Sequence, residues 1–152
     1  MGKRSDAAME NFLKGYNCAQ SVVLAFADLL PADEATLMRL SCSFGGGMGR
    51  LREVCGSVSG MLMVLGLLYG YDGPETGSVK AEQYARVQEL AATFREKNGS
   101  IVCRELLGLD HRQDVPTPEA RTAEYYKKRP CKELIGCAAG ILEDYLEAHP
   151  VE

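Results

Sequence analysis

Hydrophobic positions recur along this chain at the three- and four-residue spacing of amphipathic helices. The clearest case is residues 79–98, where Val87, Leu90, Ala91 and Phe94 fall on one face. No run of β-branched residues alternates with polar ones, and no turn signal joins two alternating segments. The pattern therefore predicts an all-α fold in which helix exceeds about half of the residues, well above the usual share of roughly one third.

Glycine, proline and capping residues divide the chain into about six to eight helices. For example, Asn17 and Gln20 form a variant of the capping box in front of an apolar run. No internal repeat or low-complexity segment interrupts the series, so residues 1–152 are predicted to form a single-domain helical bundle. The expected helices span residues 6–14, 18–30, 34–44, 52–70, 79–98, 100–107, 118–128 and 130–148.

Residues 54–71 form the most apolar stretch and contain no charge over 18 residues. That length is at the lower limit for a membrane span. Several glycines and serines soften its apolarity, so we expect the central helix of the bundle instead. The side chains expected to point inward are those of Val58, Leu62, Leu65 and Tyr69.

Charge and composition narrow the range of functions. The net charge is −4 and the basic residues are scattered, so nothing resembles a nucleic-acid-binding surface. The one short basic–aromatic run, residues 125–129, is interpreted as a solvated helix end. No apolar segment follows the basic residues at the N-terminus, which predicts a cytoplasmic protein without a signal peptide. In that compartment six cysteines indicate metal binding or catalysis before structural disulfides.

Four of the six cysteines fall at the predicted starts of helices. Free backbone N–H groups and the positive end of the helix dipole favour an anion there, which lowers a thiol pKa. The thiolate is both nucleophile and metal ligand, so these four are candidate catalytic residues and candidate metal ligands. Cys55, with Arg50 and Arg52 nearby, is expected to be the most reactive, with Cys18 as its partner. The four are Cys18, Cys55, Cys103 and Cys131.

Simple packing stays open as the alternative for each of these thiols. The other two cysteines, Cys42 and Cys137, lie within predicted helices and are expected to fill the core. There is no C-x-x-C motif, which excludes a thioredoxin-like site, and the paired spacings of zinc sites are absent. If the four candidates share one site, they must meet across separations of 37, 48 and 28 residues, or a homodimer must unite them.

A glycine-rich segment, residues 44–50, precedes the apolar helix. It matches neither dinucleotide-binding nor P-loop spacing, so nucleotide binding is not predicted. We expect it to let the backbone approach Cys55 closely and to offer N–H groups to a thiolate or a cluster sulfide. Gly56 and Gly60 would also let another helix pack tightly against the apolar one. The candidate cofactor-binding residues are Gly45, Gly46, Gly47 and Gly56.

The segment Cys55-Gly56-Ser57-Val58-Ser59-Gly60 resembles the Cys-Gly-Ala-x-x-Gly motif of the redox-active family named C_GCAxxG_C_C. Residues 16–21, 44–49 and 103–108 support the resemblance, which spans nearly the whole chain. Ser57 stands where the motif has alanine, a small-for-small change. The family is marked by four cysteines, which map onto Cys18, Cys55, Cys103 and Cys131.

The resemblance implies a small redox protein whose cofactor, substrate and redox partner are unknown. In one version the four cysteines cycle between dithiol and disulfide. In the other they ligate an iron–sulfur cluster, since a similar segment occurs in an iron–sulfur-containing cytochrome c. The alternative is a non-catalytic helical module that binds a small ligand or a partner and uses its cysteines for packing. An absorption spectrum and a free-thiol count would separate these hypotheses.

Overall fold

The computed structural model describes residues 2–74 and 77–151. Helices of the α and 3-10 types account for 68% of these residues. Within the same ranges the only β-type pairing is one antiparallel bridge, between Val54 and Val102. The prediction of an all-α fold is therefore confirmed.

The predicted helices are present, but some of their ends differ from the expected limits by four or five residues. The helix expected over 18–30 ends at Ala25, that over 52–70 begins at Gly56 and that over 118–128 begins at Ala123. The capping box is formed: the Asn17 side chain accepts a hydrogen bond from the Gln20 N–H at 2.9 Å, and the Gln20 side chain accepts one from the Asn17 N–H at 3.2 Å. Two short 3-10 turns cover Ala27–Leu29 and Cys42–Phe44. The α-helices are α1 (Lys3–Leu13), α2 (Cys18–Ala25), α3 (Glu34–Ser41), α4 (Gly45–Met48), α5 (Gly56–Tyr69), α6 (Ser78–Asn98), α7 (Cys103–Leu106), α8 (Ala123–Lys128) and α9 (Cys131–Ala148).

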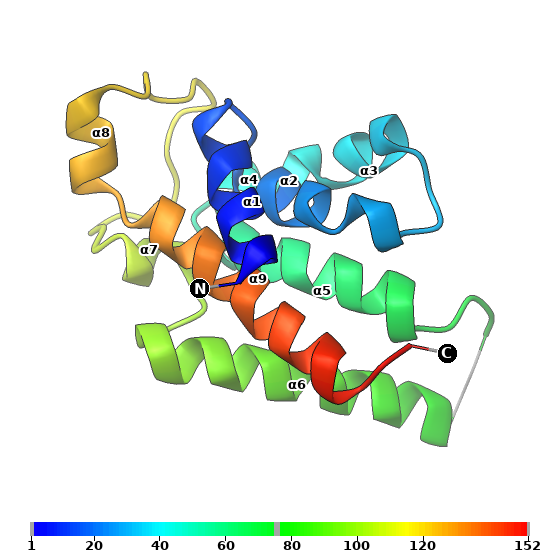
Figure 1. Cartoon of the computed structure of the whole chain (residues 1–152). Coiled ribbons are helices and arrows are strands. Elements are labelled where there is room, and N and C mark those ends of the chain that lie inside the picture. The colour runs from blue at the N-terminus through cyan, green and yellow to red at the C-terminus, as the bar shows by residue number, and fades with distance from the viewer. Residues whose placement is uncertain (1, 75–76, 152) are drawn as a thin grey trace.

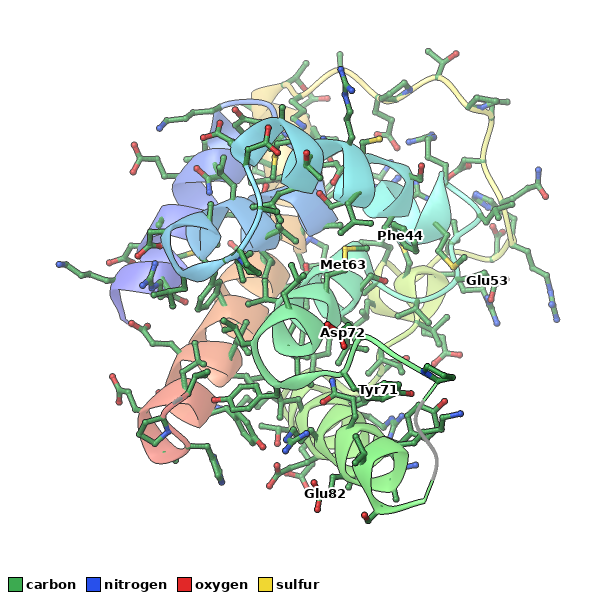
Figure 2. The ribbon with its side chains drawn as sticks, turned by 90° about the vertical axis from the view of Figure 1, so that its right-hand side faces the viewer. Phe44, Glu53, Met63, Tyr71, Asp72 and Glu82 are labelled. Carbon is green, nitrogen blue, oxygen red and sulfur yellow. The ribbon has the colours of Figure 1, made fainter. Side chains whose placement is uncertain are left out.

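Helix α5 is the central helix of the bundle, as the apolar stretch predicts. It packs against α2, α6 and α9 (Figure 1), and Figure 2, which looks nearly along α5, shows it surrounded by the others. Val58 and Leu65 are fully buried, whereas Leu62 and Tyr69 are half-buried at the edge of the core. None of the helices in the described ranges is long and apolar enough to cross a membrane.

Helix α1 lies across α9 and α2 and completes the core on the N-terminal side (Figure 1). Phe12 from α1, Phe26 at the end of α2 and Phe94 from α6 are almost completely buried. Burying side chains of this size removes a large apolar area from water, which is the main term that stabilises the bundle. The packing of α2, α5 and α9 around this core brings their N-termini toward the same side of the molecule.

Gly60 marks a close approach of α5 to α2, as the sequence predicts. An added Cβ would lie 2.7 Å from the carbonyl oxygen of Ala19, which is too short a contact. Gly60→Ala should therefore lower the free energy of unfolding by about 2 kcal/mol. At Gly66, in the same helix, an added Cβ meets no described atom within 4 Å, so Gly66→Ala should raise stability by up to about 1 kcal/mol. Urea denaturation compares the two, and equal stabilities would contradict this packing.

Candidate functional site

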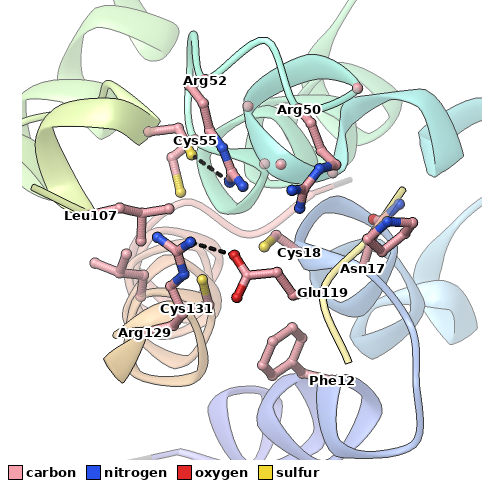
Figure 3. A pocket seen from close by; sticks show the side chains of 18 of the residues that line it. Phe12, Asn17, Cys18, Arg50, Arg52, Cys55, Leu107, Glu119, Arg129 and Cys131 are labelled. Carbon is pink, nitrogen blue, oxygen red and sulfur yellow. Dashed lines mark hydrogen bonds and ion pairs between the residues drawn. The ribbon is translucent and has the colours of Figure 1, made fainter. Parts of the chain in front are cut away.

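Four cysteines from four helix starts line one cavity of about 420 Å³. Three of them are the first residues of α2, α7 and α9, and the fourth is the N-cap residue of α5. The placement at helix starts is thus confirmed. The cavity is formed by a single chain, so no dimer is needed to bring the thiols together. They are Cys18, Cys103, Cys131 and Cys55, and Figure 3 shows the cavity from close by.

A short antiparallel pairing brings Cys55 and Cys103 together. The Cys55 N–H donates to the Ile101 carbonyl at 2.8 Å, and the Cys103 N–H donates to the Glu53 carbonyl at 2.6 Å. Side chains alternate between the two faces of a strand pair, so Cys55 and Cys103, diagonal to each other across the bridge, share one face. These two hydrogen bonds explain how residues 48 positions apart reach the same cavity.

Two glycines of the cavity wall, one in the glycine-rich segment and one at the start of α5, each pack against a thiol. Gly47 has a left-handed φ of 69°, and an added Cβ would lie 2.6 Å from the Cys103 Cβ. At Gly56 an added Cβ would lie 2.9 Å from the Cys18 Cβ. In the glycine-rich segment, Gly47 therefore approaches Cys103, whereas the sequence predicts an approach to Cys55. Gly56 allows α2 to pack tightly against α5, as the sequence predicts. Gly45, Gly46, Gly47 and Gly56 all line the cavity, and their role toward a cofactor stays a prediction.

Cys131 has the most favourable surroundings for a thiolate. The Cys18 thiol donates a hydrogen bond to the Cys131 sulfur, and this lowers the pKa of Cys131 to about 7. Burial opposes the shift, while the charges of Arg129 and Arg52 and a hydrogen bond from the Tyr125 hydroxyl support it. A thiol with this pKa is about half ionised at neutral pH, against a few per cent for an ordinary cysteine.

The pKa values of the other three thiols are shifted upward. The pKa of Cys18 is well above its ordinary value, because it donates to Cys131 and is desolvated by burial. Burial raises the pKa of Cys55 to about 11. It also raises the pKa of Cys103, although Arg52 Nη1 donates to the Cys103 sulfur at 3.6 Å. The structure therefore does not support the expectation that Cys55 is the most reactive thiol, because its sulfur is buried and Arg52 serves Cys103 instead.

Arg52 connects the cavity to the surface loop after α7. Its side chain is 5% exposed, and its Nε and Nη2 atoms each donate to Asp114 at 2.8 Å. His111 contacts the other oxygen of Asp114 at 2.7 Å. The pair with Asp114 offsets the cost of burying the guanidinium and holds it against the Cys103 sulfur.

The C-terminal half of the chain contributes a polar wall to the cavity that the sequence pattern does not predict. The interpretation of residues 125–129 as a solvated helix end is wrong at three positions. Tyr125 and Tyr126 are half-buried against the core, and Arg129 is 7% exposed. Of these three, Tyr125 and Arg129 line the cavity. Glu119 and Arg121 line it too. The one local signal is that Arg129 precedes Pro130 and Cys131, which places it just outside a helix start that carries a candidate thiol.

The two cysteines outside the motif behave differently from each other. Cys42 is exposed at the rim of the cavity, and its thiol donates to the Arg39 carbonyl at 3.2 Å. The expectation that it fills the core is wrong, since the helix ends at Ser41 and a 3-10 turn carries Cys42 outward. Cys137 packs against the core as expected and accepts a hydrogen bond from Asn98 at 3.4 Å.

The arrangement of the four thiols does not fit a single metal ion. In residues 2–74 and 77–151, no three His, Cys, Asp or Glu side chains are placed so that they could share one ion. A mononuclear zinc or iron site would require the sulfurs to converge within about 2.3 Å of one point. The cavity that the thiols line, with a volume of about 420 Å³, has room for a larger group.

Comparison with known proteins agrees with the four-cysteine pattern. Residues 16–145 match the family described as "Putative redox-active protein (C_GCAxxG_C_C)". The chain belongs to the C_GCAxxG_C_C family. The matched range contains all four cysteines of the cavity and the motif that starts at Cys55, so the family resemblance predicted from the sequence is confirmed. No curated protein and no solved structure shows significant similarity to the chain.

Proposed function

We propose that this C_GCAxxG_C_C protein is a dithiol–disulfide redox protein whose active pair is Cys131 and Cys18. The observation that carries the proposal is that Cys18 and Cys131, the first residues of α2 and α9, line the same cavity. Their interaction raises the pKa of Cys18 and lowers that of Cys131, so that one thiol keeps its proton while the other is ready to attack. Both residues keep partial solvent exposure, whereas Cys55 and Cys103 are buried.

The proposed reaction is thiol–disulfide exchange with a low-molecular-weight disulfide. The Cys131 thiolate attacks one sulfur of the substrate, the substrate S–S bond breaks, and one half leaves as a thiolate. The other half forms a mixed disulfide with Cys131. Cys18 then loses its proton to the second leaving group and attacks the Cys131 sulfur. The products are a Cys18–Cys131 disulfide and two reduced substrate halves, so two electrons pass from the cysteines to the substrate.

The surroundings of Cys131 support its role as the attacking thiol. An efficient attacking thiol has a pKa near the ambient pH, because it is then ionised without losing its nucleophilicity. Cys131 has such a pKa because it accepts hydrogen bonds from Cys18 and Tyr125 and lies near the charge of Arg129. Cys18 keeps its proton until the mixed disulfide forms, and loss of the thiolate acceptor then removes the main reason for its raised pKa.

Ligation of an iron–sulfur cluster is the second candidate. The observation that favours it is that all four family cysteines line one cavity, each at a helix start. Thiolates are the usual ligands of such clusters, and backbone N–H groups can bond to their sulfurs. The glycine segment in the cavity wall would then lie next to the cluster. When bound, a cluster would supply one-electron transfer instead of two-electron exchange.

Oxidation of the purified protein distinguishes the two candidates. After anaerobic purification, we expect no visible absorption band and six free thiols in the unfolded chain. In a Cys42→Ser variant, which lacks the exposed competing thiol, one equivalent of a neutral disulfide should reduce the count from five to three. Peptide mass mapping should then find Cys18 joined to Cys131. An iron-dependent visible band in the protein as purified would favour the cluster. A disulfide between any other pair would contradict the assignment of Cys131 and Cys18.

A further inference from the structure

A carboxylate of the chain itself extends into the thiol cavity. Glu119, from the irregular segment between α7 and α8, accepts a hydrogen bond from Arg129 Nη2 at 2.5 Å. In Figure 3 its carboxylate points toward Arg129, with Cys18, Cys131 and Arg50 around it in the same view. Arg129 and Arg50 both lower the pKa of Glu119, chiefly through the Arg129 hydrogen bond.

The cavity is positively charged although the chain as a whole carries −4. Four arginines contribute to its wall, and within the part of the chain that the structure describes Glu119 is the only carboxylate that does so. The charge of Arg52 is balanced by Asp114, which is not among the residues that line the cavity. Arg121 is held by the carbonyl oxygens of Phe12 and Tyr16. Arg50 lies 3.9 Å from Asp114, the carboxylate that also pairs with Arg52. Without Glu119, Arg129 would therefore face the cavity as an uncompensated cation.

The two partners of this ion pair differ in how easily they can separate. The side chain of Arg129 is 6% exposed and that of Glu119 is 37% exposed. A buried guanidinium requires an anion beside it, whereas a carboxylate that is one third exposed returns to water at modest cost. An incoming anion can therefore replace Glu119 while Arg129 stays in place.

We infer that Arg129, supported by the nearby charge of Arg50, forms an anion subsite beside the Cys18–Cys131 pair, which Glu119 fills in the free protein and a carboxylate of the substrate takes over. The substrate class is then an anionic low-molecular-weight disulfide. The apolar part of the wall, from Phe12, Leu107 and Leu134, suits the body of such a molecule. A volume of about 420 Å³ lies within the usual range for small-molecule pockets. The inference rests on the proposed exchange reaction at Cys131.

Two chromogenic disulfides that differ in charge test this subsite. Dithiobis(nitrobenzoate) carries two carboxylates, and dithiodipyridine is neutral at the same pH. The measured quantity is the ratio of their rate constants with the full-length reduced protein. All chains carry Cys42→Ser, because the exposed Cys42 thiol would react with both reagents, and this parent serves as the wild type in the comparison. The ratio cancels changes in the ionisation of Cys131, which affect both reagents equally. It therefore reports only how the protein discriminates by charge.

Removing the internal carboxylate should favour the anionic reagent. We expect Glu119→Gln to raise the anionic-to-neutral ratio about fivefold and Arg129→Gln to lower it about fivefold, as screened charges at this range allow. Arg129→Lys keeps the charge and should keep the ratio within about twofold of the wild type. Glu124→Gln removes the same charge from α8, where Glu124 is exposed, and should leave the ratio unchanged.

The outcomes separate the subsite from the exchange reaction. If the neutral reagent reacts normally but the ratio is the same in wild type, Glu119→Gln and Arg129→Gln, the anion subsite is wrong and the proposed function stands. If Glu124→Gln raises the ratio as much as Glu119→Gln, the effect is one of net charge and the subsite is again wrong. If Cys131 reacts with neither reagent, the proposed function fails and the inference fails with it.

Discussion

Replacing Cys131 with serine is expected to slow the reaction with a neutral disulfide at pH 7 by about a hundredfold, whereas Cys55→Ser should change the rate by less than about twofold. Cys131 has a pKa of about 7 and Cys55 one of about 11. Only the first therefore supplies an appreciable thiolate fraction at neutral pH. The measurement is the stopped-flow rate of the first exchange step under an excess of the disulfide.

The exposed thiol of Cys42 has to be removed from this comparison. Because Cys42 lies at the surface, it reacts independently of the cavity, so all variants should carry Cys42→Ser. Circular dichroism of each variant shows whether the helical fold is kept. A fast phase that survives Cys131→Ser and disappears in Cys55→Ser would contradict the assignment and restore Cys55 as the reactive thiol.

The fold could be predicted from local sequence because its main signals are local. The capping box at Asn17, the helical spacing in residues 79–98 and the uncharged stretch of residues 54–71 each describe one helix without reference to the rest. The errors lie at helix ends. The helix expected over 18–30 ends at Ala25 and is followed by a 3-10 turn at Ala27–Leu29. The apolar helix begins at Gly56 instead of near residue 52, because residues 53–55 pair with residues 101–103.

The site could be predicted only in part, because helix starts are local features and the surroundings of a thiol are not. Spacing and caps place four thiols at the starts of helices, and the family resemblance selects the same four. The order of their pKa values depends on contacts between distant segments. The pKa of Cys131 is lowered by Cys18, which lies more than a hundred positions away in the sequence. The pKa of Cys55 is raised by burial under other helices. Neither effect has a signature in the flanking sequence.

The same reason explains why Arg129 and Glu119 were missed. A basic run at a helix end is usually solvated, and a glutamate in a proline-containing loop usually faces water. In this chain the loop folds back over the helix starts and brings Glu119 against Arg129. Electrostatic arguments from sequence are limited to neighbours along the chain, such as Arg50 and Arg52 beside Cys55. The structure reassigns Arg52 to Cys103 and Asp114.

Two substitutions of Cys18 should separate its two roles. As a hydrogen-bond donor, Cys18 lowers the pKa of Cys131, and as a thiol it closes the disulfide. Cys18→Ala removes both roles, so the pKa of Cys131 should rise toward the ordinary value and the rate of the first step at pH 7 should fall about tenfold. Cys18→Ser keeps a hydroxyl donor, so its first step should stay within about threefold of the wild type.

The pH dependence of the reaction rate tests whether Cys18 acts as a hydrogen-bond donor to Cys131. The thiolate is the reactive form, so the wild-type rate should rise as pH increases through about 7, the pKa of Cys131, and then level off. In Cys18→Ala the same rise should occur at higher pH and reach a similar plateau, because full ionisation removes the need for the donor. Both variants should stop at the mixed disulfide, seen as one substrate half added to the protein mass. If Cys18→Ala keeps the wild-type pH profile, the hydrogen bond does not set the pKa of Cys131. If the Cys18→Ala protein still releases both substrate halves, another thiol resolves the mixed disulfide.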